Sequence, residues 1–250
     1  MAVRCSFVRW VVLVVLMSVV AAYARPGGEP TIASQEQRLT PSADRAAFMR
    51  QHFELAMAVH EALVRGELPV ARQKAAALVD RPDPQNLPAD AAPYLATMRL
   101  AAARAAAAVE VEDVAAASGA MLATCGDCHR AVGTMPAHAF PPSPTVGGQV
   151  GHMLTHQQAV DLMVQGLTVP SAWLWQSGAA ALERAPLRKV VSAANEKLSR
   201  NHQDAERSVH YLASRALFAS DQRSRMYVYS ELAQSCATCH SRLKGGDDPW

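Results

Sequence analysis

The sequence predicts an all-α protein, and three observations support this prediction. Alanine-rich stretches of strong helix formers cover residues 98–109 and 114–123. Valine and isoleucine do not alternate with period two anywhere after residue 24, so no strand pattern is present. Apolar side chains recur instead at helical spacing, which places on one face Met49, Phe53, Ala56, His60 and Leu63.

The first half of the chain is expected to contain four helices. The first ends at Gly66, because glycine readily adopts the left-handed conformation found after helix ends. The segment Arg81-Pro-Asp-Pro is expected to be a loop, since proline interrupts helices. The four helices are expected over residues 44–65, 70–79, 90–109 and from about 112 through 129.

The second half is expected to repeat this arrangement after a linker. Residues 133–148 are rich in proline and glycine, so no helix should cross them. The charged stretch 185–200 fits either a loop or a further helix. The helices are expected over residues 149–165, 171–184, 201–218 and 221–243.

The N-terminus has the pattern of a secretory signal peptide. Arg4 and Arg9 precede an apolar run over residues 10–20, and Ala22-Tyr23-Ala24 is a typical cleavage site. The run is too short to favour a membrane span, so no stable membrane insertion is expected after cleavage. We therefore expect residues 1–24 to be removed, residues 25–40 to form a flexible leader, and the protein to be periplasmic or otherwise exported.

The charge of the exported chain limits its partners. Residues 1–24 contain two of the 24 basic residues and none of the 22 acidic ones, so the mature chain is balanced at 22 of each. A neutral chain argues against nucleic acid as a main partner. The sequence does not determine an oligomeric state.

The sequence contains two copies of the motif Cys-x-x-Cys-His, and these indicate its chemistry. One consists of Cys125, Cys128 and His129, and the other of Cys236, Cys239 and His240. This motif is the attachment site of c-type haem: the two thiols bond to the porphyrin, and the histidine supplies a proximal ligand to the iron. The sequence thus predicts two covalently bound haem c groups, with His129 and His240 as iron ligands.

A Cys-x-x-Cys pair has two other common uses in proteins. A thioredoxin-like redox motif requires a βαβ context, which the sequence does not show. A zinc site built from both pairs would leave the histidine that follows each pair without a role. Export, and the use of all four cysteines that remain after cleavage, favour haem.

The two motifs end two similar halves. Met49-Arg-Gln-His52 recurs as Met153-Leu-Thr-His156, 104 positions later, and Ala75-Ala-Ala-Leu78 recurs at the same offset. The haem motifs are 111 positions apart, a difference of about two helical turns. Duplication explains this order, which predicts two tandem four-helix bundles over residues 41–132 and 149–250, each with a Cys-x-x-Cys-His site on its last helix.

The position of the motifs resembles that in one haem-protein family. Only ten residues follow His240, and none is methionine or histidine, so no distal ligand can follow the motif in its own domain. A four-helix bundle with the motif on its last helix is similar to the class II cytochromes c, the cytochrome c′ and c-556 group. The second motif continues with Leu243 and Lys244 as that family often does, whereas the first departs from it at Val132 and Gly133.

The resemblance implies that the first helix of each half crosses the distal face of the haem. His52 and His156 recur on these helices and are the expected distal ligands. Met49, Met153 and His152 are their rivals, and Phe48 occupies the place corresponding to His152. His60, His202 and His210 are expected to be structural or exposed.

Three functions fit these features. One-electron transfer between exported redox partner proteins ranks first, and no catalytic residues are assigned. A five-coordinate protein that binds small gases such as NO or CO, as cytochromes c′ do, is the alternative. A dihaem peroxidase ranks last, because no distal acid–base group demands it.

Overall fold

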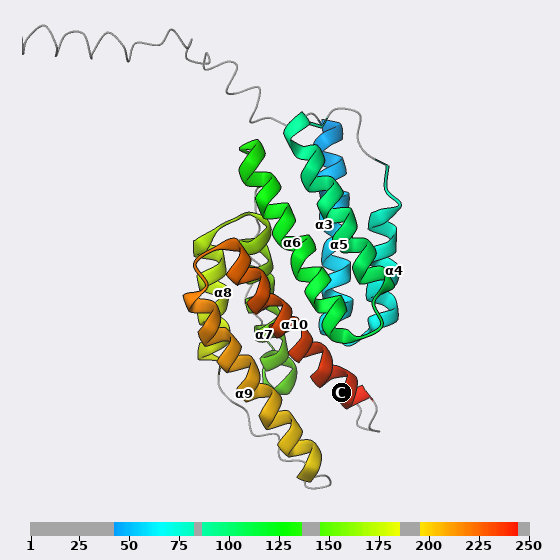
Figure 1. Ribbon diagram of the computed structural model, residues 1–250. Helices are drawn as coiled ribbons and strands as arrows, with labels where there is room; N and C mark the ends of the chain where they lie inside the picture. The colour runs from blue at the N-terminus through cyan, green and yellow to red at the C-terminus, as the bar shows by residue number, and fades with distance from the viewer. Residues whose placement is uncertain (1–42, 83–86, 137–145, 186–195, 245–250) are drawn as a thin grey trace, which may run out of the picture. The chain divides into compact units, whose positions relative to one another are not determined.

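The computed structural model describes residues 43–82, 87–136, 146–185 and 196–244 (Figure 1). These residues form eight α-helices, one 3₁₀ turn and no strand, which confirms the all-α prediction. The expected signal peptide, the leader and most of the expected linker lie outside them. No helix in this part of the chain is long and apolar enough to cross a membrane.

The helices agree closely with their expected positions. The first half contains α3 (Ala43–Val64), α4 (Leu68–Val79), η1 (Ala89–Ala91), α5 (Ala92–Ala107) and α6 (Val111–Val132). The second half contains α7 (Gly148–Thr168), α8 (Ala172–Arg184), α9 (Glu196–Phe218) and α10 (Gln222–Lys244). The charged stretch at 185–200 thus ends within a helix, because α9 starts at Glu196.

Local sequence explains several helix ends. Gly66 follows α3 with φ +70°, and Glu67 N–H donates to the carbonyl of Ala62 at 2.8 Å. Gly133 follows α6 with φ +67°, and Thr134 N–H donates to the carbonyl of His129 at 2.9 Å. Both arrangements satisfy carbonyls that a helix C-terminus leaves unpaired.

Each half packs its four helices in chain order. α3 packs on α4, α4 on α5 and α5 on α6, and α6 returns to α3. In the second half, α7, α8, α9 and α10 pack in the same order, and α10 returns to α7. The diagonal helices α7 and α9 bring no Cα atoms within 8 Å of each other in the described residues.

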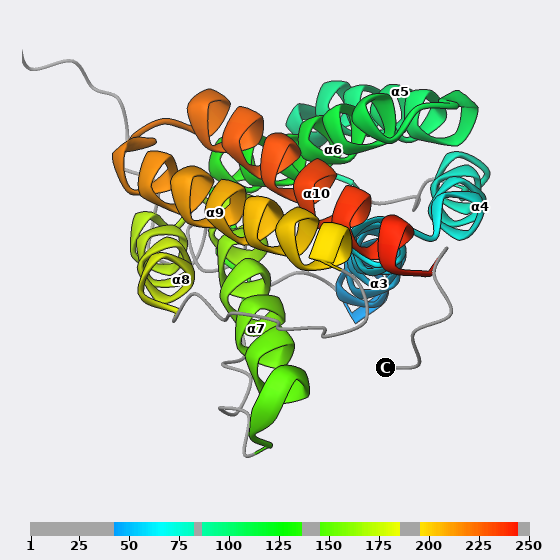
Figure 2. The ribbon, with the colours of Figure 1, turned by 90° about the horizontal axis from the view of Figure 1, so that it is seen from below.

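The two halves join along α6 and α10. These helices run in opposite directions beside each other (Figures 1 and 2). In addition, α6 contacts α7 and α10 contacts α3, so the last helix of each half touches the first helix of the other. One apolar core extends from Val59 in α3 to Leu232 in α10, and residues 41–250 form one compact unit.

The buried face of α3 differs from the expected one at Phe53. Ala56, His60 and Leu63 are buried as expected, but Phe53 is 42% exposed. The buried stripe runs instead through Phe48 and His52. Residue 53 follows 52 by a rotation of about 100° on the helix, which turns its side chain out of that stripe.

The helices α6 and α10 pack tightly at Gly119. A Cβ there would clash with Ser230 Oγ and lie 3.1 Å from the carbonyl oxygen of Met226. Gly119 and Ser230 are 111 positions apart, the same offset as the two haem motifs. The small residues at equivalent positions therefore allow the two halves to meet at this crossing.

We expect Gly119→Val to destabilise the protein by about 1–3 kcal/mol, because overpacking forces buried helices apart. Urea denaturation followed by circular dichroism measures this loss. Ala116→Val is the control, since Ala116 is exposed on the same helix. Equal losses from both variants would show that the crossing at Gly119 has no special steric role.

Candidate haem sites

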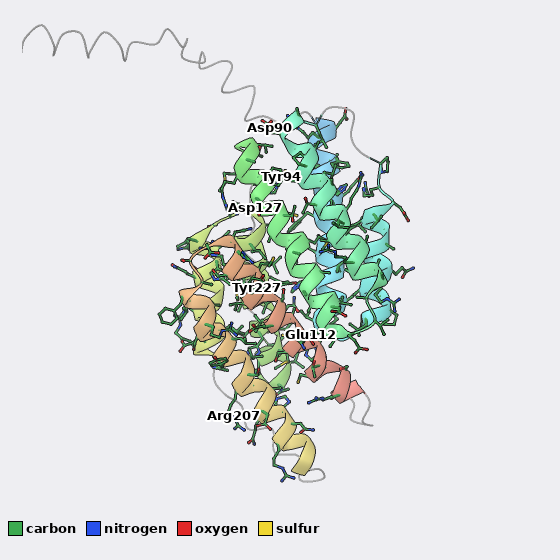
Figure 3. The ribbon with its side chains drawn as sticks, viewed as in Figure 1. Asp90, Tyr94, Glu112, Asp127, Arg207 and Tyr227 are labelled. Atoms are coloured by element: carbon green, nitrogen blue, oxygen red, sulfur yellow. The ribbon has the colours of Figure 1, made fainter. Side chains whose placement is uncertain are left out.

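The first motif lies at the C-terminal end of α6. Figure 3 labels Asp127, between the two cysteines of this motif, and Glu112 at the opposite end of the helix. Cys125 Sγ donates to the carbonyl of Met121, four residues earlier, at 3.4 Å. Both cysteines are partly buried, so the helix presents them beside the protein interior.

The histidine of the first motif is held in a definite tautomer. His129 Nδ1 lies 2.7 Å from the backbone carbonyl oxygen of Thr168 at the end of α7. A carbonyl only accepts, so Nδ1 must carry the proton, and the lone pair of the neutral ring is on Nε2. Burial lowers the pKa of His129, opposed by this hydrogen bond, and so favours the neutral ring. A neutral imidazole with its lone pair on Nε2 is the form that binds iron.

The histidine of the second motif makes the matching contact. His240 Nδ1 lies 2.5 Å from the backbone carbonyl oxygen of Val64 at the end of α3. The same reasoning places the lone pair of its neutral ring on Nε2. An Nδ1–H bonded to a carbonyl is a common way to orient a metal-binding histidine.

The two contacts are exchanged between the halves. Val64 and Thr168 are the last residues of α3 and α7, and they are 104 positions apart, as are the repeated Met-x-x-His segments. Each motif histidine is thus oriented by the first helix of the other half. Sequence repeats predicted two similar sites, but they gave no sign of this exchange.

Glycines and one glutamine allow the exchanged contacts. A Cβ at Gly66 would lie 2.9 Å from the carbonyl oxygen of Ala237 and 3.0 Å from Ser241 N, so α3 ends directly against α10. A Cβ at Gly126 would clash with the carbonyl oxygen of Leu167, so α7 ends directly against α6. Gln222 Nε2 donates to the Leu167 carbonyl at 2.6 Å, and this bond links α10 to the end of α7.

The thiols of the four motif cysteines differ from those of a typical redox pair in the direction of their pKa shift. None of them forms a disulfide. Burial, with a smaller contribution from the neighbouring thiol, raises the pKa of Cys125 to about 12, and the same causes raise the pKa of Cys236 to about 12. Thiol–disulfide chemistry requires a lowered thiol pKa.

The cysteine pairs also do not form a shared zinc site. Among the described residues, one group of three or more histidine, cysteine or carboxylate side chains is close enough to hold an ion, and it contains no cysteine. That group consists of His152, His156 and Glu206. The zinc alternative, which needed both pairs in one place, is therefore not supported by the structure.

The second motif opens onto a cavity of about 70 Å³. Its walls combine the motif residues Cys236, Cys239 and His240 with Met153 and His156 of α7 and with His202 and Glu206 of α9. A further hollow of about 540 Å³ between α9 and α10 also has Cys239 in its wall. The expected distal residues of the second half thus lie beside its motif.

The expected distal residues of the first half lie on α3, which packs against the motif helix α6. His52 is 7% exposed, and its Nδ1 donates to the Phe48 carbonyl at 3.1 Å. The Phe48 and His52 rings have their centroids 3.9 Å apart. Met49 is partly buried against the apolar core.

His60, His202 and His210 were expected to be structural or exposed, and their contacts differ. His60 is fully buried, as a structural role requires, and its Nδ1 lies 2.8 Å from the Tyr229 hydroxyl of α10. His202 is buried beside Glu206, and His210 lies near His156, so both belong to a cluster with His152. His202, Glu206 and His210 follow one another at intervals of four residues, which places all three on one face of α9. This spacing was visible in the sequence.

Comparisons with protein-family models, with curated proteins and with solved structures give no match to this chain. The geometry of the two motifs is therefore the basis for assigning a function.

We expect Gly66→Ala to destabilise the protein more than Gly133→Ala. Both glycines have positive φ, so each substitution costs about 1–2 kcal/mol of backbone strain. A Cβ at Gly133 meets nothing within 4 Å, whereas one at Gly66 meets α10. Urea denaturation of the two variants measures the difference. Equal destabilisation would mean that the contact between the α3 end and α10 contributes little.

Proposed function

We propose that this chain is an exported dihaem c-type cytochrome that transfers single electrons, with one haem attached to each Cys-x-x-Cys-His motif. Its two halves would be tandem haem-binding four-helix bundles of the class II cytochrome type. Cys125 and Cys128 would hold the first haem, and Cys236 and Cys239 the second. His129 and His240 would be the proximal ligands.

The observation that carries this proposal is the matched orientation of the two motif histidines. Each uses Nδ1 to bind a backbone carbonyl, and each ring therefore has its lone pair on Nε2. Two unrelated surface histidines would have no reason to share this geometry at equivalent ends of α3 and α7. Histidines that bind a metal commonly have their other ring nitrogen held in this way, and a thiol redox pair has no need of it.

The donor set fits haem c better than the alternatives do. Each pair of partly buried thiols precedes a correctly oriented imidazole on a helix, and the second set borders a cavity. When bound, haem supplies an iron centre that changes reversibly between the ferric and ferrous states. The chain's own residues would hold that group, fix its proximal imidazole and exclude water with the apolar core.

Electron transfer is favoured over gas binding by the residues on α3 and α7. A distal ligand keeps the iron six-coordinate, so little reorganises when an electron arrives. His52 is the proposed distal ligand of the first haem, since it is buried on the helix that faces α6. In the second half, Met153 and His156 both border the cavity of the motif.

The proposed partners are other exported redox proteins. The signal-like N-terminus and the balanced charge of the mature chain fit a carrier that meets such proteins outside the cytoplasm. Small gases would be ligands only under the alternative function.

The purified exported protein should contain two haems per chain, measured by pyridine haemochrome absorbance and by intact mass. Cys125→Ala with Cys128→Ala should remove one haem and leave the other, and Cys236→Ala with Cys239→Ala should do the reverse. A wild-type chain that carries no covalent haem would refute the proposal.

His52→Ala should convert one of the two haems to a form that binds CO, because it removes the proposed distal ligand. Absorption spectra of the ferrous protein with and without CO measure this change, and the wild-type protein should ignore CO. Met49→Leu is the matched control and should leave both haems unchanged. If Met49→Leu opens a haem instead, Met49 is the ligand; if the wild-type protein binds CO at once, gas binding replaces electron transfer.

A further inference from the structure

A cluster of histidines and one glutamate fills the space between α7 and α9. His152 Nε2 donates to Glu206 Oε1 at 2.7 Å, and the rings of His152 and His156 have their centroids 4.3 Å apart. His202 Nε2 lies 3.8 Å from Glu206 Oε1, and the His210 ring lies 6.5 Å from that of His156. His152, His202 and Glu206 are each only 5% exposed.

Most of this cluster lacks hydrogen-bond partners. Four of its buried polar atoms make no hydrogen bond: His156 Nε2, His202 Nε2, His210 Nε2 and Glu206 Oε2. A buried polar atom without a partner costs about 1–3 kcal/mol. Three residues of the cluster, His156, His202 and Glu206, also line the cavity of the second motif. A haem iron accepts one ligand on its distal face, so the iron would take at most one of these four atoms. The excess indicates a second ligand that takes several donors at once.

The donors have the chemistry of a transition-metal site. One ligand atom each from His152, His156 and Glu206 lies within 4.8 Å of the other two, so a single ion can reach all three. Two imidazoles and one carboxylate suit first-row transition metals, whereas calcium and magnesium prefer oxygen ligands alone. Burial is the largest of several causes that lower the pKa of His156 to about 4, which keeps this ring neutral and able to bind a metal.

We propose that His152, His156 and Glu206 bind a divalent first-row transition-metal ion, of which zinc is the probe, at a site in the wall of the cavity that borders the second motif. His202 lies beside this carboxylate, with its Nε2 3.8 Å from Glu206 Oε1. With His156 bound to this ion, Met153 remains as the candidate iron ligand on α7 that borders the cavity of the second motif. The site would join α7 to α9, whose backbones do not otherwise approach each other in the described residues.

This site belongs to the second half alone. Phe48 stands where the repeat offset of 104 would place a counterpart of His152. The counterpart of Glu206 is Ala102 at the offset of 104 and Leu95 at the offset of 111, and neither can bind a metal. Duplication followed by divergence would therefore have given one half a metal site that the other lacks.

Zinc binding to the haem-loaded protein tests the proposal. The protein is dialysed against EDTA, which leaves covalent haem in place, and then titrated with Zn²⁺; zinc and haem iron are measured together by plasma mass spectrometry. We expect one tightly held zinc per chain. Glu206→Gln and His152→Phe, which copies the first half, should weaken binding on the order of tenfold or more.

Arg207→Gln is the matched control. Arg207 follows Glu206 on α9 but points away from the molecule (Figure 3), with 62% of its side chain exposed. This variant should bind zinc as the wild-type protein does. Circular dichroism checks that each variant is folded. If a variant is not folded, the number of zinc ions bound by the wild-type protein still tests the proposal.

Two results would overturn the proposal. One is a wild-type protein that carries both haems yet binds no more zinc than Glu206→Gln. The other is a change in a haem spectrum in His156→Ala, which would make His156 an iron ligand. Loss of the proposed cytochrome function would instead appear as missing haem in the haemochrome assay, whatever the zinc result.

Discussion

The close contact of α6 with α10 is the constraint on which the other features of the structure depend. Gly119 and Ser230 leave space for these helices to pass each other closely. A side chain at Gly119 would clash with Ser230. The crossing brings the end of α7 to α6 and the end of α3 to α10. These ends supply the carbonyls that orient His129 and His240.

The exchange of contacts makes the two halves dependent on each other. A bundle formed by either half alone would have its motif histidine without the carbonyl that holds Nδ1. The apolar core also makes the stability of each half depend on the other, since it runs continuously through both halves. Such a reciprocal exchange of the same contact is typical of a two-fold symmetric pair.

The halves have nevertheless diverged around their first helices. His52 lies against Phe48 in the first half, whereas His156 lies against His152, with Glu206 bonded to His152, in the second. An aromatic hydrocarbon ring and a buried polar cluster are very different environments for a metal centre. The two proposed haems should therefore differ in their properties, although their motifs are the same.

The sequence by itself determined the helices, their ends and the equivalence of the two motifs, because these depend on local spacing, on glycine and on repeated words. His156, expected from the sequence as a distal ligand, lines the cavity of the second motif. The sequence misplaced Phe53 and missed the cluster of His202 and Glu206, since the orientation of one helix toward a diagonal neighbour is not encoded in its own periodicity. Only the tertiary structure decided which half holds each motif histidine. The partner of that histidine is a backbone carbonyl, which every residue has, so packing alone selects Val64 and Thr168.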